Sequence, residues 1–183
     1  MLDKPDRRGY AVEMKKILVC IALMACLTGA PALDDIQILP TRKKLDEDKA
    51  RTGSNSSVQS TQIAYSVKVT SRAFKELQNV TVKYNIFYED SQLGSTAKPE
   101  IKTASGSQAF PSLLTNKPVE FETSAIQLDK AALDGGWYYM DGGKSVSKDK
   151  VVGLWFKAFN AEGKQIAEYA NPPSVTQKRK WKE

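Results

Sequence analysis

The stretch from Asn79 to Asp90, NVTVKYNIFYED, decides the fold class. Because successive side chains of a β-strand point to opposite faces, apolar residues at every second position predict a half-buried strand. The positions between them are mostly polar, as expected for the other face. The residues that set this period of two are Val80, Val82, Tyr84, Ile86 and Tyr88.

The same period recurs on both sides of this stretch. Gln62 to Thr70 alternates through Ile63, Tyr65, Val67 and Val69, and a third run from Val119 to Thr123 continues toward Ile126 and Leu128. Each predicts a further half-buried strand.

The segment from Val151 to Phe159, VVGLWFKAF, is apolar on both faces and predicts a central strand, with Trp155 as its core anchor. Asn160 to Gly163 then predicts a turn, and Lys164 to Tyr169 predicts the partner strand of a hairpin.

Other segments carry weaker patterns. Asp34 to Pro40 predicts a first strand that Pro40 ends, and Gly53 to Ser60 predicts a loose segment. The charges of Arg42 to Arg51 stand at helical spacing, which favours a short surface helix or a linker, and Leu128 to Leu133 favours a helical turn. Glycines and prolines between Asp90 and Pro118 predict short edge strands and crossing loops.

These patterns predict an all-β chain, and an immunoglobulin-like or fibronectin type III-like β-sandwich of about seven strands. A jelly roll or a small barrel is the alternative. The expected division is an upstream segment and signal peptide over 1–32, an N-terminal strand and flexible linker over 33–61, a sandwich core over 62–171 and a basic tail over 172–183.

The segment from Met14 to Ala32, MKKILVCIALMACLTGAPA, has the three parts of a secretory signal. Two lysines precede an apolar run from Ile17 to Leu27, and Ala30-Pro31-Ala32 supplies small residues for cleavage. We therefore expect an exported protein that begins at Leu33, with a lipid-modified Cys26 or a twin-arginine signal at Arg7-Arg8 as alternatives. The apolar run is too short to span a bilayer, so no integral membrane span is expected after cleavage.

The residues after Ala32 contain neither Cys nor His, because Cys20 and Cys26 are the only cysteines and the chain has no histidine. This composition excludes Ser-His-Asp and Cys-His nucleophiles and Cys/His zinc sites. We expect no cofactor, no metal site and no enzymatic activity. One catalytic alternative stays open, a glycosidase using Glu120 and Glu122, which would lie roughly 7 Å apart on one face of a strand.

The chain has a net charge of +6, but much of the positive charge after the leader is in the last residues, so the folded body is close to neutral and no nucleic-acid partner is expected. A solvated tail is expected for these last residues, with contact to anionic lipid or acidic glycan as the alternative. Those basic residues are Lys178, Arg179, Lys180 and Lys182.

The segment from Asp134 to Gly143, DGGWYYMDGG, places four large side chains between two glycine pairs. Aromatic side chains dominate binding hot spots, so an exposed loop here predicts a site for a protein partner or for sugar rings. The alternative is an edge strand whose aromatic rings close one end of the sandwich. The candidate binding residues are Trp137, Tyr138, Tyr139 and Met140.

The leader, the lack of Cys and His after it, the strand NVTVKYNIFYED and the hairpin VVGLWFKAFNAEGKQIAEY together resemble a known group. They are similar to the small secreted immunoglobulin-like proteins of Akkermansia-type verrucomicrobia, which are encoded among type IV pilus-like assembly genes. The resemblance implies a pilus- or envelope-associated interaction module that contacts a protein in the envelope or on a host. It implies no catalytic residues.

Overall fold

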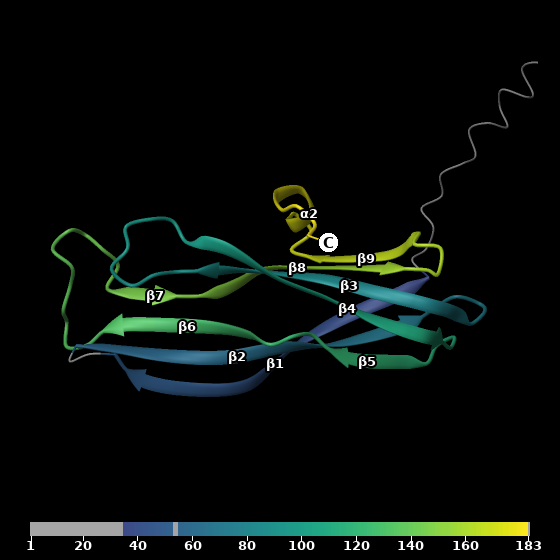
Figure 1. The fold of residues 1–183 in the computed structure, drawn as a ribbon, viewed down its shortest axis with the longest axis horizontal. Coiled ribbons are helices and arrows are strands. Elements are labelled where there is room, and N and C mark those ends of the chain that lie inside the picture. Colours follow the sequence, from purple (N-terminus) through teal and green to yellow (C-terminus); the bar gives the residue numbers. More distant parts are fainter. Residues whose placement is uncertain (1–34, 53–54, 183) are drawn as a thin grey trace, which may run out of the picture. The chain divides into compact units, whose positions relative to one another are not determined.

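Two antiparallel sheets packed face to face make up the described part of the chain (Figure 1). The structure is a computed structural model that describes residues 35–52 and 55–182, so the predicted signal peptide, both cysteines and the expected start at Leu33 lie outside it. Its elements are β1 (Ile36–Arg51), β2 (Ser56–Ser71), β3 (Leu77–Asp90), β4 (Glu100–Leu113), β5 (Pro118–Glu122), β6 (Ile126–Leu133), β7 (Val146–Lys148), β8 (Lys150–Phe159), β9 (Gln165–Asn171) and α2 (Val175–Lys178).

Apart from β7, which follows β6 in the chain and so differs from strand D, the strand order is that of an immunoglobulin-like sandwich. One sheet runs β1-β2-β6-β7, with β5 also paired to β2, and the other runs β4-β3-β8-β9. In immunoglobulin domains, strands A, B and E share one sheet and strands C, F and G share the other, with C′ beside C in variable domains. Here β1, β2 and β5–β6 take the places of A, B and E, while β3, β8 and β9 take those of C, F and G. The predicted all-β sandwich is confirmed, and a jelly roll or barrel does not form.

The core lies between the two sheets and is built from the residues with the period of two. Val67 and Val69 of β2 face Val82 and Ile86 of β3, and all four are completely buried. Phe156 of the central strand β8 completes this layer. The alternation of apolar and polar residues therefore identified the inward face of both sheets correctly.

Trp155 was expected to anchor this core. It is buried, but it does not lie between the two sheets. Its neighbour Phe156 points between the sheets, so Trp155 points to the outer face of β8. There it forms a second cluster with Phe87 and Val175. The segment apolar on both faces is thus covered on both faces, as predicted for a central strand.

The described residues form more strands than the expected number, partly because one predicted strand is interrupted. β5 and β6 both pair with β2, but three residues, 123–125, lie opposite two of β2. This is a β-bulge. Thr123 stabilises it, because its backbone N–H donates to Tyr65 O and its hydroxyl accepts the Tyr65 N–H, both at 2.9 Å.

The helix or linker expected over Arg42–Arg51 does not form. These residues belong to β1, which pairs with β2 from Ile36↔Ser71 to Arg51↔Ser57, so the loose segment expected up to Ser60 is also partly strand. A helical i, i+4 ion pair contributes only about 0.2–0.5 kcal/mol, far less than a continuous ladder. Pro40 does not end the strand, because a proline without an N–H is tolerated on an edge strand.

Two other local expectations are also corrected. Leu128 to Leu133 is strand β6 rather than a helical turn, paired with β2 on one side and β7 on the other. The short pieces expected between Asp90 and Pro118 include one continuous edge strand, β4. Gly106 lies within this strand and pairs with Tyr84. The Tyr84 side chain packs on the glycine, because any Cβ at that position would lie 2.4 Å from Tyr84 Oη.

The C-terminal residues are not a solvated tail. They form α2 and then lie on the outer face of β8, where the Trp181 ring meets the Trp155 ring edge-on at 5.2 Å. The Asn85 side-chain amide donates to Lys182 O at 3.1 Å. Gly153 allows this close approach, because a Cβ there would lie 2.3 Å from Val175 Cγ2. Apolar anchoring outweighs the basic composition of the segment.

Candidate binding surface

The aromatic loop, residues 134–143, connects β6 to β7 and is tied to the sheet at its base. Leu133 N donates to Ser145 O at 2.9 Å, which closes the two ends of the connection. Asp134 N donates to Asn55 O at 2.8 Å, and the Ser57 hydroxyl donates to Asp134 Oδ1 at 3.0 Å. The loop therefore begins from a fixed point beside the start of β2.

The β3–β4 loop holds the aromatic loop from the side. Gly94 N donates to Lys144 O at 2.9 Å, and Lys144 Nζ donates to Ala97 O at 3.1 Å. Gly143 makes this contact possible, because a Cβ there would lie 2.2 Å from Gly94 O. Tyr139 also packs here, since a Cβ on Gly94 would lie 2.9 Å from Tyr139 Cζ.

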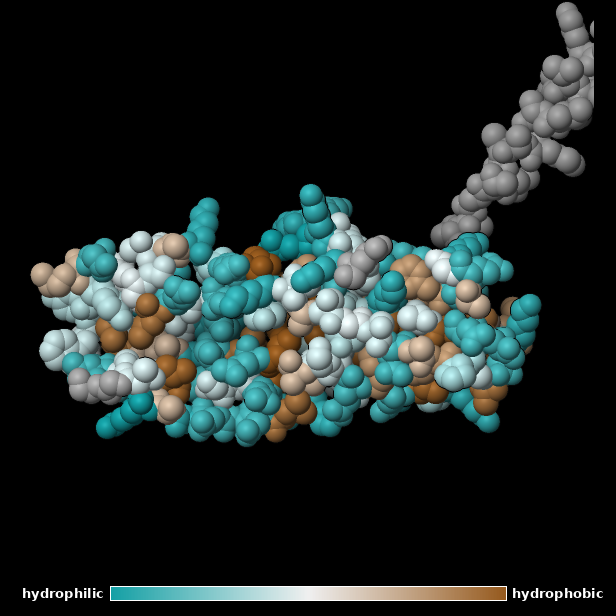
Figure 2. All heavy atoms as spheres, viewed as in Figure 1, coloured by the Kyte–Doolittle hydropathy of each residue, from teal (hydrophilic) through white to brown (hydrophobic). Residues whose placement is uncertain are grey.

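Three of the four predicted binding residues are exposed. Trp137 is 60% exposed, Tyr138 73% and Met140 93%, whereas Tyr139 is half-buried against Gly94. In Figure 1 the loop is the green connection at the far left, and in Figure 2 the same end shows pale and tan residues among teal ones. No strand forms within 134–143, so the alternative of an edge strand that closes the sandwich is wrong.

Gly143→Ala is expected to separate the two loops, because the new Cβ meets backbone rather than a flexible side chain. The Gly94 amide should then exchange its hydrogen faster, while the free energy of unfolding changes by less than about 1 kcal/mol, since the contact is local. Hydrogen–deuterium exchange measures the first effect and urea denaturation the second. Unchanged exchange at Gly94 would contradict the contact.

The carboxylates considered for a glycosidase do not face each other across a cleft. Glu120 and Glu122 lie on the exposed face of β5. Lys68 Nζ lies 3.8 Å from Glu120 Oε1, and Lys43 forms an ion pair with Glu122. This is the cross-strand charge pairing typical of an exposed sheet face.

Basic side chains from three strands gather beside the aromatic loop. A groove of about 400 Å³ is lined by Lys49 and Arg51 of β1 and by Lys130 of β6. An adjoining groove of about 280 Å³ shares Lys130 and adds Arg42 and Lys148. No local pattern in the sequence signals this cluster, because Lys130 and Lys148 are far in the chain from the basic residues of β1 and only strand pairing brings the three strands together.

Within residues 35–52 and 55–182, no three acidic, His or Cys side chains are grouped so that they could hold a metal ion. No helix in the same part of the chain is both long and apolar enough to cross a membrane.

The comparisons with known proteins found only distant structural similarity. No protein-family model and no curated protein matches the chain. The X-ray structure of a Northeast Structural Genomics Consortium target aligns over 76% of this chain and 88% of its own, with 8% identity and a TM-score of 0.33. A crystal structure from Akkermansia muciniphila aligns over 78% and 73%, with 11% identity and a TM-score of 0.27.

A GH3 beta-glucosidase from Bifidobacterium adolescentis aligns over 72% of this chain but only 17% of its own, with 13% identity and a TM-score of 0.20. At these TM-scores the alignments carry no argument about function.

Proposed function

We propose that this chain is an exported, non-enzymatic interaction module of the cell envelope or surface that binds another protein through its aromatic loop. The observation that supports it is the exposure of Trp137, Tyr138 and Met140 on a loop that is held at its base and at its side. A held loop loses little conformational entropy on binding, so more of the contact energy is available as affinity.

Met140 favours a protein partner over a sugar. Methionine side chains are flexible and apolar, and they are enriched together with aromatic residues in the buried centres of protein interfaces. A carbohydrate-binding module is the second candidate, because the rings of Trp137 and Tyr138 are both exposed and aromatic rings stack on sugars.

Export rests on the signal pattern from Met14 to Ala32, and the lack of enzymatic activity rests on the lack of His and Cys after it. The resemblance to pilus-associated immunoglobulin-like proteins supports an envelope location and a pilus association. We therefore expect the partner in the envelope or on a host surface.

Trp137→Ala combined with Met140→Ala is expected to abolish capture of the partner from envelope extract while leaving the melting temperature almost unchanged, because both side chains are largely exposed. Immobilised protein, extract and quantitative mass spectrometry measure capture. Phe74→Ala is the matched control, since Phe74 is 106% exposed in the β2–β3 turn, beyond the end of β2 away from the loop.

Equal loss of capture in the Phe74→Ala control would contradict the proposed surface. Capture that neutral oligosaccharides abolish by competition would favour the carbohydrate-binding alternative.

A further inference from the structure

One row of the β1-β2-β6-β7 sheet carries three lysines side by side. Lys49 of β1 pairs with Gln59 of β2, Gln59 pairs with Lys130 of β6, and Lys130 pairs with Lys148 of β7. Directly paired residues share a face of the sheet, and like charges in such pairs are destabilising. The next row adds Arg51, which pairs with Ser57. The direct pair of Lys130 and Lys148 therefore does not stabilise the sheet through its charges.

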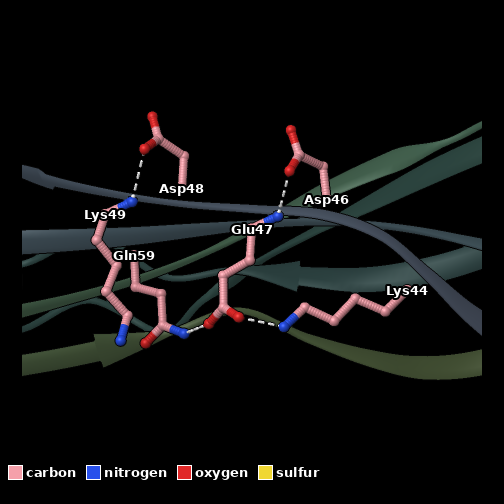
Figure 3. Close-up of polar contacts among 6 residues, drawn as sticks. All are labelled: Lys44, Asp46, Glu47, Asp48, Lys49 and Gln59. Atoms are coloured by element: carbon pink, nitrogen blue, oxygen red, sulfur yellow. Dashed lines mark hydrogen bonds and ion pairs between the residues drawn. The ribbon is translucent and has the colours of Figure 1, made fainter.

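Two of the three acidic residues of β1 are turned away from this row. Asp46 and Asp48 alternate with the residues of the row and lie on the other side of the strand from Lys49 (Figure 3). Their carboxylates accept the backbone N–H groups of Glu47 and Lys49, at 2.7 and 2.8 Å. The alternation of side chains along a strand thus keeps Asp46 and Asp48 away from the lysines of the row.

The carboxylates that lie near the row are already engaged. Glu47 accepts hydrogen bonds from Lys44 and Gln59, and the bond from Lys44 holds the pKa of Glu47 below its usual value, so it stays ionised and paired. Asp149, which lines the second groove, accepts the backbone N–H groups of Ser91 and Asp129 at 2.8 and 3.0 Å.

The basic side chains themselves remain available. Within the described part of the chain, the ion pairs involve other residues, and none includes a basic residue that lines either groove. Those residues are Arg42, Lys49, Arg51, Lys130 and Lys148.

The two adjoining grooves share Lys130, and together they are called the basic groove. We propose that the basic groove binds the sulfate or carboxylate groups of an acidic polysaccharide. Strands stand about 4.8 Å apart, so the row from Lys49 to Lys148 extends over roughly 14 Å, enough to meet several anionic groups along one chain. Each exposed charge contributes little alone, and a repeating ligand adds such contacts together.

The composition of the grooves favours a polysaccharide over a single-stranded nucleic acid. Proteins that bind single strands stack the bases on aromatic side chains. No aromatic side chain lines either groove. The basic groove is distinct from the aromatic loop, so this inference goes beyond the protein-binding function proposed above.

Binding of the purified protein to fluorescent heparin, which is sulfated, and to hyaluronate, which is carboxylated, tests the proposal by anisotropy at low and high salt, with neutral dextran alongside. The double variant Lys49→Gln with Lys130→Gln is expected to weaken binding by about tenfold or more. Salt should weaken the binding of the unmodified protein as well. Heparin binding alone assigns the site to sulfate, and binding of both polymers assigns it to anionic groups generally.

A charge-matched control is Lys68→Gln with Lys102→Gln, which removes two lysines that pair with Glu120 and Asp90 elsewhere. It should change affinity by less than about twofold. Thermal melts confirm that each variant folds, and removing Lys130 from opposite Lys148 should not lower stability.

Four results would overturn the proposal. The first is equal binding of dextran and heparin, and the second is an unchanged affinity in the Lys49→Gln, Lys130→Gln variant. The third is tighter binding of single-stranded DNA than of either polysaccharide. The fourth is loss of heparin binding in Trp137→Ala, which would move the site to the aromatic loop.

Discussion

Phe156→Ala is expected to lower the free energy of unfolding by about 3–5 kcal/mol, the usual cost of removing a buried phenylalanine ring. Phe156 is completely buried between the sheets. Its ring lies 5.8 Å from the ring of Tyr84 and 6.1 Å from the ring of Tyr169, so the substitution removes contacts from both sheet strands that flank it. Urea denaturation followed by circular dichroism measures the change.

The control for this prediction is Phe74→Ala, the same substitution at a fully exposed position. It should change the free energy of unfolding by less than about 0.5 kcal/mol. Since a domain of this size has a total stability of about 5–15 kcal/mol, Phe156→Ala leaves a marginally folded protein. A change below about 1 kcal/mol would show that this position lies outside the core.

Trp155→Ala is also expected to lower the free energy of unfolding by about 3–5 kcal/mol, because it removes packing on the outer face of β8. The Trp155 indole donates to Glu168 Oε1 at 2.6 Å, and Lys157 Nζ lies 4.8 Å from the ring centres of both Trp155 and Trp181. Loss of the indole therefore removes the surface on which the C-terminal residues pack.

A second measurement separates this effect from that of Phe156. In Trp155→Ala, trypsin should cleave faster at the basic C-terminal residues under conditions where the domain stays folded, because local opening exposes them. Trp137→Ala, on the aromatic loop, should leave both the free energy of unfolding and the cleavage rate unchanged. Equal C-terminal cleavage in Trp155→Ala and the unmodified protein would contradict the described packing of Trp181.

The prediction of the strands succeeded where one face is apolar and the other polar. β2 and β3 follow such patterns. β8 was found by its apolar residues on both faces, and Gly163 has the positive φ of 76° that the predicted turn permits. The prediction failed where charge dominated, as in Arg42–Arg51, because a charged edge strand and a surface helix have similar compositions. Which of the two forms depends on β2, which lies beside it in space.

The sequence predicted which segment forms the candidate binding surface, but not which of its side chains are exposed. The glycine-flanked segment around Trp137 has an unusual local composition, so it could be found, but its exposure follows from contacts with Gly94 and Asn55 in other parts of the chain. Nothing local distinguished Tyr139, which packs on Gly94, from Tyr138, which points to solvent.

The sequence by itself determined that this protein is a β-sandwich, because a period of two and turn residues act between neighbours in the chain. Only the tertiary structure decided where its charges and its C-terminal residues lie. Lys49 and Lys130 come into one row through the register of three strands, and Trp181 packs on Trp155 because the chain folds back after β9. Such contacts depend on the pairing of distant segments, which the buried face of the whole sheet selects and no single segment encodes.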